Sequence, residues 1–435
     1  MAEQKVDVYV KYLIIGGGIS GLTFANYVQK DFCLVEKEDE VGGYCRTIRD
    51  KGFIWDYAGH FFHFNTEEFK QRFIDSIDPR EIIYKQKNTK ILYKQSLINY
   101  PFQTNIHQLD KQEFIECLYD LFNKQEKNEY DNFLDMLYGK FGKSIVEKFL
   151  KPYNEKLYAV DLQELDKDAM GRFFPYASIS SIINNMKENQ DNVSYNNTFL
   201  YPRQGAGAFI QLLVDTLDMN NIKLNSEVVK IDKDNKIAEL SDGTIVNYKY
   251  LINTSPLNSF LKIFKSRPFG EIEDILSYNK VLVFNLGFNK KSKYTSEHWF
   301  YIPDKEINFY RIGFYDNILD TDKLSMYVEI GYSKDSEIDL QYQLDETLKN
   351  LRLIGILEPD MQLIAHTSIV MDPAYVHIST QSEEAVKKFK ETVEKNQIYT
   401  IGRYGGWKYC SMEDCMMEAK KIAEKICCNK INPVI

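Results

Sequence analysis

Glycines near the N-terminus have the spacing of a phosphate-binding turn. The run Gly16-Gly17-Gly18-Ile19-Ser20-Gly21 follows residues 12–15, which we expect to be a buried parallel strand. Gly16 permits a tight turn, Gly18 lets the backbone approach a pyrophosphate, and Gly21 lets the following helix pack closely on the strand. The N-terminus of that helix supplies free N–H groups and a partial positive charge. The run therefore predicts a dinucleotide site.

An acidic residue completes this fingerprint. The second expected strand, 32–35, ends at Glu36, twenty residues after Gly16. A carboxylate there accepts hydrogen bonds from both hydroxyls of an adenosine ribose and disfavours a 2′-phosphate. These features follow one another at the spacing of the fingerprint: a strand, the glycines, a helix, a second strand and the acidic residue. Residues 10–40 are therefore expected to form a βαβ unit.

A second glycine pair favours FAD over NAD. The segment Val41-Gly42-Gly43-Tyr44-Cys45-Arg46-Thr47 resembles a turn of the flavoprotein family that includes amine oxidases, protoporphyrinogen oxidase and sugar-nucleotide mutases. In that family the turn closes over the pyrophosphate and leads to the flavin. The resemblance therefore implies FAD as the cofactor.

Later segments resemble the UDP-galactopyranose mutases in particular, over about residues 10–425. Residues 52–63, with His60 and His63, resemble the histidine loop of that family. Residues 99–105 resemble the segment that holds the uridine, where an aromatic ring stacks on the base. Residues 151–158 resemble a segment beside the nucleotide-sugar, with a tyrosine where relatives often have tryptophan.

The same resemblance implies a diphosphate site. Arg172 matches an arginine on a loop that closes over the diphosphate, and Asn192 and Asn196 match a second flap. A planar guanidinium forms charge-assisted bidentate bonds to phosphate, and tyrosine hydroxyls add donors without charge. The residues that match the family's later phosphate ligands are Tyr301, Arg311 (ten positions further on), Tyr375 and Tyr409.

The C-terminal motif resembles one that packs against the flavin ring. Gly402-Arg403 is followed by an expected helix beginning near Met412, whose dipole would stabilise negative charge on a reduced flavin. Ser411 stands where bacterial mutases often carry aspartate, and the flaps resemble the eukaryotic type.

The resemblance implies a flavin-dependent mutase that interconverts UDP-galactopyranose and UDP-galactofuranose, a step in cell-surface polysaccharide biosynthesis. Reduced FAD would act through a covalent adduct between its N5 atom and the sugar, with no net redox change. The residues expected to bind FAD are Gly16, Gly18, Ile19, Ser20, Gly21, Glu36, Lys37, Gly42, Gly43, Tyr44, Arg46, Gly59, His60, Val228, Gly402, Arg403 and Met412. Those expected to bind the nucleotide-sugar are Tyr100, Phe102, Gln103, Asn154, Tyr158, Arg172, Asn196, Tyr301, Arg311, Tyr375 and Tyr409, and the catalytic residues are His60, Arg172 and Arg311.

Two alternatives stay open at this point. One is an oxidase of the amine-oxidase or protoporphyrinogen-oxidase type, which needs an aromatic cage rather than phosphate donors. The other is a catalytically silent flavoprotein. The sequence also leaves open the exact sugar and base, the oligomeric state, and whether NAD(P)H or a reductase supplies electrons.

The expected fold class is α/β, with a Rossmann-type FAD-binding domain, an inserted helical domain and an antiparallel-sheet substrate domain. Apolar residues at helical spacing fill 107–190, and short strand patterns fill 278–370. The expected parts are a FAD-binding domain in three stretches (8–85, 203–256 and 391–435), substrate-sheet strands (86–106), a helical insertion with a substrate loop (107–190), a second flap and strand (191–202), and the substrate domain (257–390).

Composition excludes several other classes of function. The formal net charge is −9, which argues against a nucleic-acid surface. No apolar run reaches the length needed to span a bilayer, and the N-terminal residues lack the order of a secretion signal. The 7 cysteines show no paired spacing, and the 6 histidines form no metal motif. We therefore expect a cytoplasmic protein without a metal site.

Overall fold

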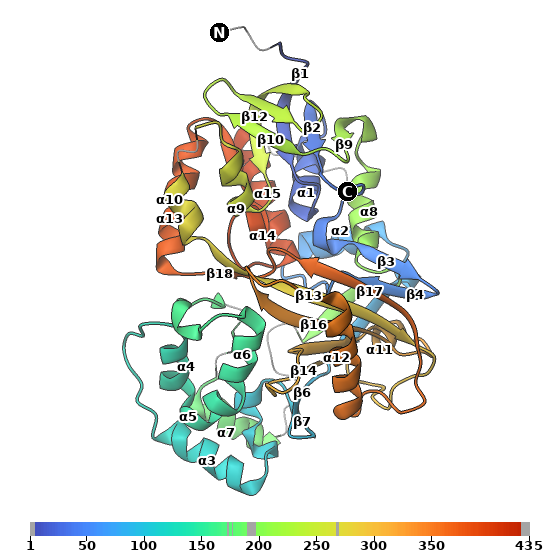
Figure 1. Cartoon of the computed structure of the whole chain (residues 1–435), viewed down its shortest axis with the longest axis vertical. Helices are drawn as coiled ribbons and strands as arrows, with labels where there is room; N and C mark the ends of the chain where they lie inside the picture. Colours follow the sequence, from blue (N-terminus) through green and yellow to red (C-terminus); the bar gives the residue numbers. More distant parts are fainter. Residues whose placement is uncertain (1–4, 172–173, 176, 189–196, 267–268, 428–435) are drawn as a thin grey trace.

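The computed structural model describes residues 5–171, 174–175, 177–188, 197–266 and 269–427. Two large sheets and a helical block organise this part of the chain. In Figure 1 the first sheet lies at the top, the second crosses the middle, and the helices between residues 111 and 188 form the lower left part.

The first sheet is the nucleotide-binding sheet. Its strands are β1 (Val8–Ile15), β2 (Phe32–Val35), β9 (Ile222–Lys223), β10 (Val228–Asp232), β11 (Ile237–Leu240), β12 (Ile245–Asn253) and β19 (Ile398–Thr400). The strand order is β10-β11-β12-β1-β2-β9, with β19 also paired to β12. The central pairs are parallel, and they join stretches of chain that are far apart in the sequence.

Both faces of this sheet are buried, as expected for parallel strands that read as continuous apolar runs. In β1, Ile14 packs into one core and Leu13 and Ile15 pack into another. The helices that contribute buried residues to the Ile14 side are α1 (Ile19–Val28), α8 (Gly207–Asp215) and α15 (Met412–Cys427). Those that pack on the other side are α9 (Leu257–Phe260), α10 (Gly270–Ile275) and α13 (Thr380–Glu394), and the short α14 (Gly402–Gly405) precedes α15.

The second sheet is mostly antiparallel. Its strands are β6 (Thr89–Tyr93), β7 (Ser96–Asn99), β13 (Ser277–Phe288), β14 (Trp299–Tyr301), β15 (Arg311–Phe314), β16 (Ser325–Ser333), β17 (Leu363–Met371) and β18 (Val376–His377). Their order is β17-β13-β16-β15-β14-β6-β7, with β18 also paired to β13. Side chains alternate between faces: Leu282 and Phe284 pack in a core with residues of α12 (Leu340–Leu353), whereas Val281 and Val283 face the main core. A short helix, α11 (Tyr315–Leu319), follows β15.

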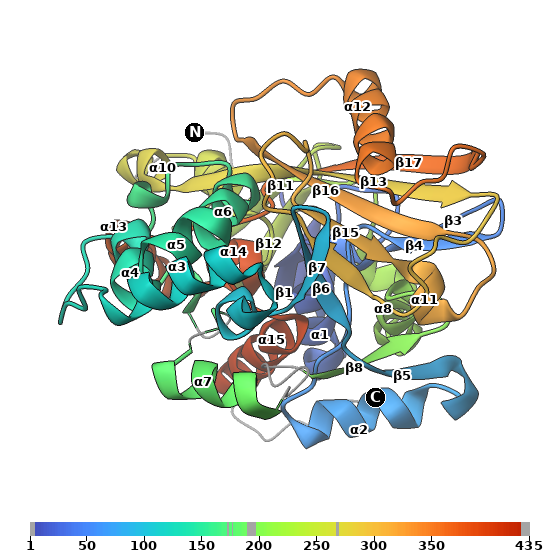
Figure 2. The same cartoon turned by 90° about the horizontal axis from the view of Figure 1, so that it is seen from below.

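The remaining elements surround these sheets. Figure 2 shows the helical block on one side of the molecule and the β5–β8 ladder with α2 on the other. The block consists of α3 (Lys111–Phe122), α4 (Phe133–Phe141), α5 (Lys143–Ile145), a π-helical turn (Val146–Leu150), α6 (Lys151–Tyr158) and α7 (Ile179–Glu188). The other elements are α2 (Glu67–Ser76) and the paired strands β3 (Thr47–Asp50) with β4 (Phe53–Asp56) and β5 (Ile82–Gln86) with β8 (Thr198–Pro202). Across the described ranges, none of the helices is both long and apolar enough to cross a membrane.

Candidate active site

The glycine-rich turn after β1 forms one end of a cavity. Gly16 has a φ of 96°, a conformation that favours glycine. A Cβ on Gly21 would lie 2.1 Å from the Gly16 carbonyl oxygen, so the turn and α1 can approach this closely only with glycine there. A Cβ on Gly18 would meet no atom within 4 Å in the described part of the chain. The Gly18 backbone is therefore open to the cavity at the N-terminus of α1, where N–H groups favour a phosphate.

The carboxylate of Glu36 lies at the same end of the cavity. Its Oε2 accepts a hydrogen bond from the Gly17 N–H at 2.7 Å, and its Oε1 accepts one from the Glu38 N–H at 3.0 Å. Because each carboxylate oxygen has a further lone pair, both can still accept a ribose hydroxyl. Ser226 also lines the cavity, and its buried hydroxyl has no hydrogen-bond partner among the described residues.

The second glycine pair closes over the first turn. The Gly42 N–H donates to the Gly17 carbonyl oxygen at 2.8 Å. Arg46 follows this pair, and its Nη1 donates to the Tyr57 hydroxyl at 3.4 Å. The Arg46 Nε is buried and makes no hydrogen bond in the described ranges, although Glu40 Oε1 lies 3.6 Å from it. A ligand oxygen can satisfy such a group, so the residues present fit an anionic dinucleotide.

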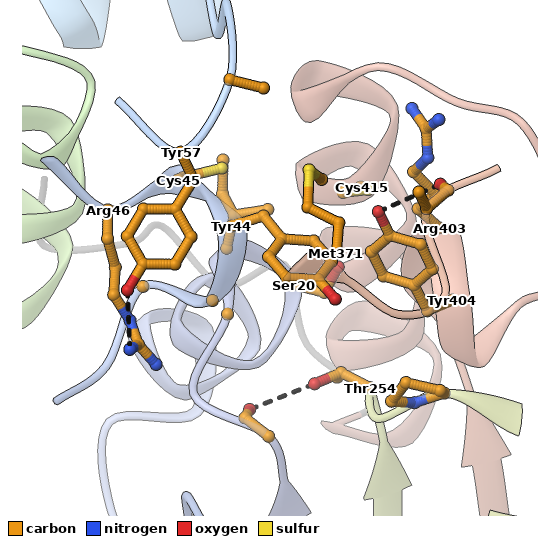
Figure 3. Close-up of a pocket in the computed structure, with 18 of the residues that line it drawn as sticks. Ser20, Tyr44, Cys45, Arg46, Tyr57, Thr254, Met371, Arg403, Tyr404 and Cys415 are labelled. Carbon is orange, nitrogen blue, oxygen red and sulfur yellow. Dashed lines mark hydrogen bonds between the residues drawn. The ribbon is translucent and has the colours of Figure 1, made fainter. Parts of the chain in front are cut away.

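These elements line one cavity of about 820 Å³. Its wall includes the carboxyl ends of β1 and β2 and side chains of β13, β15, β16 and β17, so the cavity extends from one sheet to the other. Arg46 and Tyr57 lie at one side and Arg403 and Tyr404 at the opposite side, with Tyr44, Met371 and Cys415 between them (Figure 3). The volume suits a cofactor-sized ligand.

Most residues predicted to bind FAD line this cavity: Gly16, Gly18, Ile19, Ser20, Glu36, Lys37, Gly42, Gly43, Tyr44, Arg46, Gly59, His60, Val228, Arg403 and Met412. Gly21 and Gly402 lie outside its lining. Gly402 nevertheless lies close to α1: a Cβ at this position would be only 2.4 Å from the Ser20 hydroxyl. The structure thus brings the first, second and C-terminal motifs together around one space.

Three residues on adjacent strands form a row at the end of the cavity that lies opposite the glycine-rich turn. Tyr301 of β14 is paired with Arg311 of β15, and Arg311 with Glu329 of β16. Arg311 donates from Nε to Glu329 Oε2 at 3.0 Å and from Nη2 to Oε1 at 2.7 Å. The Tyr310 hydroxyl also donates to Glu329 Oε2, at 2.7 Å. Two of the five N–H groups of Arg311 are used in this way, which leaves three for a ligand.

Arg403 and two tyrosines form a stacked cluster between the cofactor motifs and this row. The Arg403 guanidinium carbon lies 4.6 Å from the ring centroid of Tyr409 and 5.2 Å from that of Tyr375. The two rings stack with centroids 5.9 Å apart. Burial raises the pKa of Tyr375 to about 12, so its hydroxyl stays a neutral donor. All three residues line the cavity, as does Arg311.

His60 lines the cavity as a neutral side chain. Its Nδ1 lies 3.0 Å from the Ala58 carbonyl oxygen, which can only accept, so Nδ1 carries the proton and Nε2 keeps its lone pair. Burial, together with the positive charges of Arg403 and Arg311, lowers the pKa of His60 to about 4. His60 therefore offers an acceptor at neutral pH.

The residues predicted to hold the nucleotide lie in a buried layer beside the cavity rather than in its wall. The Phe102 ring stacks on Phe149 with centroids 5.1 Å apart. Gln103 donates its amide to the Pro175 carbonyl oxygen, and Asn154 donates its amide to the Leu150 carbonyl oxygen. Within the described ranges, three buried oxygens of this layer have no hydrogen-bond partner: Gln103 Oε1, Asn154 Oδ1 and the Tyr158 hydroxyl.

Tyr100 and Tyr301 link that layer to the row at the far end. Their ring centroids lie 4.7 Å apart, and Tyr301 is the cross-strand neighbour of Arg311. Neither ring is part of the cavity lining. Arg172, Asn192 and Asn196 lie outside the described residues.

Two features of the wall were not predicted from the sequence. Glu329 is a charged residue in the apolar run of β16, and a charged residue inside an apolar strand could have marked it as a candidate site residue. Ser411 caps α15: its hydroxyl accepts from the Asp414 N–H at 3.2 Å, and Asp414 Oδ2 accepts from the Ser411 N–H at 2.8 Å. This reciprocal capping gives Ser411 a structural role at the position where bacterial mutases often carry aspartate.

Comparisons with known proteins agree with this geometry. Residues 14–76 match the family of NAD(P)-binding Rossmann-like domains. A crystal structure of reduced UDP-galactopyranose mutase superimposes with a TM-score of 0.90 at 24% identity, covering 97% of this chain and 94% of that one. The chain therefore has a Rossmann-type nucleotide-binding domain within an α/β fold, which confirms the predicted fold class. Its fold is that of UDP-galactopyranose mutase, as the sequence motifs indicated.

More distant structures share the same architecture. A protein from Exiguobacterium sp. 255-15, provisionally described as a protoporphyrinogen oxidase, has a TM-score of 0.73 at 17% identity, with 97% of this chain and 99% of that one covered. A fatty acid isomerase from P. acnes has a TM-score of 0.63 at 13% identity, with 96% and 98% covered. The fold therefore accommodates different reactions, and the side chains of the site must decide among them.

Proposed function

We propose that this protein is a member of the UDP-galactopyranose mutase family that binds FAD and interconverts UDP-galactopyranose and UDP-galactofuranose. The observation that carries the proposal is a single cavity with a dinucleotide cradle at one end and a cluster of arginines and tyrosines at the other. An amine oxidase, which acts on a neutral or cationic apolar substrate, has no use for such cations. A diphosphate bridge carries about two negative charges and needs them.

FAD would be held by the chain's own cradle. The open backbone at Gly18 and the N-terminus of α1 would bind the pyrophosphate, and Glu36 would accept the ribose hydroxyls. The Arg46 Nε makes no hydrogen bond in the described ranges and has the Glu40 carboxylate 3.6 Å away, so it could still donate to a phosphate oxygen. When bound and reduced, the flavin would supply a nucleophilic nitrogen, N5, for the anomeric carbon of the sugar.

Arg311 would bind the substrate diphosphate. Glu329 holds one edge of the guanidinium, so the remaining N–H groups have a fixed direction before the substrate arrives. Tyr375 and Tyr409 would add neutral donors, and Tyr301 would support Arg311 from the neighbouring strand. Arg172 would close over the same phosphates. Holding UDP beside the sugar after their bond breaks is a positioning task, worth several kcal/mol as effective concentration.

The uridine would occupy the layer of Phe102, Gln103 and Tyr158. The unpartnered oxygens of Gln103, Asn154 and Tyr158 match the polar edge of uracil, which offers both a donor and acceptors. Aromatic stacking on a base contributes roughly 1–3 kcal/mol. Tyr100 is the half-buried ring of this layer, whereas Phe102 is fully buried against Phe149 and would support the base from behind. Asn196 would contribute from the second flap.

His60 would act beside the flavin without changing its own charge. At neutral pH its Nε2 is an acceptor, so it can take a hydrogen bond from the cofactor or the sugar. The proposal includes a cytoplasmic location and NAD(P)H or a reductase as the electron source. It also assigns the product to cell-surface polysaccharide synthesis.

Anaerobic incubation with UDP-galactose tests the proposal. Dithionite-reduced holoprotein should form UDP-galactofuranose, seen by chromatography, whereas the oxidised holoprotein should form none and keep its yellow flavin spectrum. Bleaching of the oxidised flavin by the sugar nucleotide would identify an oxidoreductase instead. UDP binding without any furanose after reduction would identify a silent flavoprotein. Either result removes the mutase assignment.

Arg311→Lys tests the role of Arg311 in turnover, and Arg352→Lys is its matched control. Lysine keeps the charge but loses the planar fork, so Arg311→Lys should lower turnover by about 100-fold or more. Arg352 lies exposed on α12, away from the cavity lining, and its replacement should leave turnover unchanged.

A further inference from the structure

Two cysteines face each other in the wall of the cavity. The Sγ atoms of Cys410 and Cys415 lie 3.5 Å apart. Both thiols are buried, and both residues line the cavity between Arg403 and the turn helix α1. A disulfide needs an S–S distance of about 2.05 Å, so the two sulfurs must approach each other by about 1.5 Å to form one.

The local backbone fixes this pair. Cys410 precedes α15 and Cys415 lies in its first turn, so four residues separate them. The reciprocal bonds between Ser411 and Asp414 hold the connecting turn, and the Cys415 N–H donates to the Ser411 carbonyl oxygen at 3.2 Å. The Arg403 Nη1 donates to the Cys410 carbonyl oxygen at 3.4 Å. The two sulfurs are therefore held together by bonds outside the thiols themselves.

The surroundings favour a thiolate on one sulfur. A hydrogen bond from Cys410 lowers the pKa of Cys415, and the Ser20 hydroxyl and the Arg403 backbone lower it further. A helix N-terminus acts in the same direction. By contrast, burial raises the pKa of Cys45, a third cysteine in the wall, to about 12. Cys415 is therefore the sulfur of the pair that loses its proton more readily.

We propose that Cys410 and Cys415 form a redox-active pair that interconverts between dithiol and disulfide and exchanges two electrons with FAD bound in this cavity. Two S–H bonds break and one S–S bond forms, which releases two electrons and two protons. Oxidised FAD bound in this cavity would take both electrons and one of the protons, and the second proton would pass to solvent. A cellular dithiol reduces the disulfide again by thiol–disulfide exchange.

This inference rests on the proposed binding of FAD but not on mutase activity. It gives the protein a means to reach or hold the reduced flavin state that the proposed reaction requires. It also explains buried paired thiols in a chain otherwise suited to a reducing compartment, where disulfides are usually transient and catalytic.

Mass spectrometry tests the pair directly in the wild-type holoprotein. Trypsin cleaves after Lys408 and Lys420, so both cysteines lie in one peptide. After diamide treatment and alkylation, this peptide should be lighter by two hydrogen atoms and carry no alkyl group, and dithiothreitol should restore both alkylation sites. Full alkylation of both cysteines after diamide, or a link from either to Cys45, would overturn the proposal.

An anaerobic dithionite titration tests the exchange with flavin. After oxidation, wild-type holoprotein should consume about twice as many electrons per FAD as Cys410→Ser, because the disulfide takes two in addition to the two of the flavin. Cys117→Ser, which alters a buried thiol in α3, should behave as wild type. Equal consumption by wild type and Cys410→Ser would overturn the exchange. Doubled consumption without furanose formation would refute the mutase while leaving the redox pair in place.

Discussion

Arg311 and Glu329 form a two-point ion pair in the wall of the cavity, with N···O distances of 3.0 and 2.7 Å. Glu329 is only 1% exposed, and its two oxygens accept hydrogen bonds from this arginine and from the Tyr310 hydroxyl. The pair fixes the guanidinium plane before any ligand binds. Pre-orientation of this kind lowers the cost of binding a bidentate anion.

Replacing Glu329 with glutamine should therefore impair substrate handling. Glutamine keeps the size of the side chain but cannot neutralise Arg311 or accept both of its N–H groups. We expect kcat/KM for UDP-galactose to fall about 100-fold, as for a misplaced catalytic group, with unchanged flavin content. Steady-state kinetics on Glu329→Gln, with the exposed Glu337→Gln as control, checks this. A variant with wild-type kinetics would show that Glu329 does not position Arg311.

Glu36→Ala should weaken the retention of FAD. The change removes the acceptor proposed for the ribose hydroxyls and also leaves the Gly17 N–H without its 2.7 Å partner. Hydrogen bonds to a charged group contribute about 1.5–3 kcal/mol each, so affinity should fall by at least tenfold. The flavin-to-protein absorbance ratio after gel filtration measures this loss. Asp39→Ala is the matched control, and equal ratios in the two variants would exclude the ribose contact.

Arg403→Lys should weaken ligand binding at the cluster formed by Arg403, Tyr375 and Tyr409. The planar guanidinium lies on the rings of Tyr375 and Tyr409, and an ammonium cannot stack in the same way. The lost interaction is worth about 1–2 kcal/mol, which corresponds to a five- to thirtyfold weaker affinity. Isothermal titration of apoprotein with FAD, and of holoprotein with UDP, would show which ligand depends on Arg403. Unchanged affinity for both would place Arg403 outside the site.

His377 should make stability depend on pH. Its Nε2 lies 3.0 Å from the Tyr158 carbonyl oxygen, and its Nδ1 lies 2.9 Å from the Ser277 hydroxyl. Burial lowers the pKa of His377 from 6.5 to about 4. Below pH 6.5 the unfolded chain takes up a proton that the folded protein excludes, so the free energy of unfolding falls as the pH decreases to about 4.

Urea unfolding of wild type and His377→Gln at several pH values isolates this effect. The stability advantage of the wild type should be constant above about pH 7 and decrease by up to about 3 kcal/mol toward pH 4. A difference between the two proteins that does not change with pH would mean that His377 titrates normally in the folded state.

The nucleotide cradle could be predicted from the sequence because its parts are local. The relative positions of Gly16, Gly21 and Glu36 follow from a strand, a turn and a helix that are contiguous in the chain, and the structure places the three residues together. The motif fixes backbone geometry over a short distance, so little depends on the rest of the fold.

The far end of the site depends on tertiary pairing, which a single sequence does not specify. Tyr301 and Arg311 were predicted by resemblance, but Glu329 becomes their neighbour only through the register of β15 on β16. The burial of Phe102 and Gln103 likewise follows from packing against the helical block. Cys410 and Cys415 lack the usual paired spacing, and the helical turn between them brings their sulfurs together.

Approach to equilibrium from the furanose side tests the central claim most directly. Dithionite-reduced holoprotein is incubated with UDP-galactofuranose under anaerobic conditions, and both sugar nucleotides are followed by chromatography while the flavin spectrum is recorded. We predict conversion to UDP-galactopyranose, the same final ratio as from UDP-galactose, and a flavin that stays reduced. No interconversion, or oxidation of the flavin in proportion to the sugar consumed, would contradict the account.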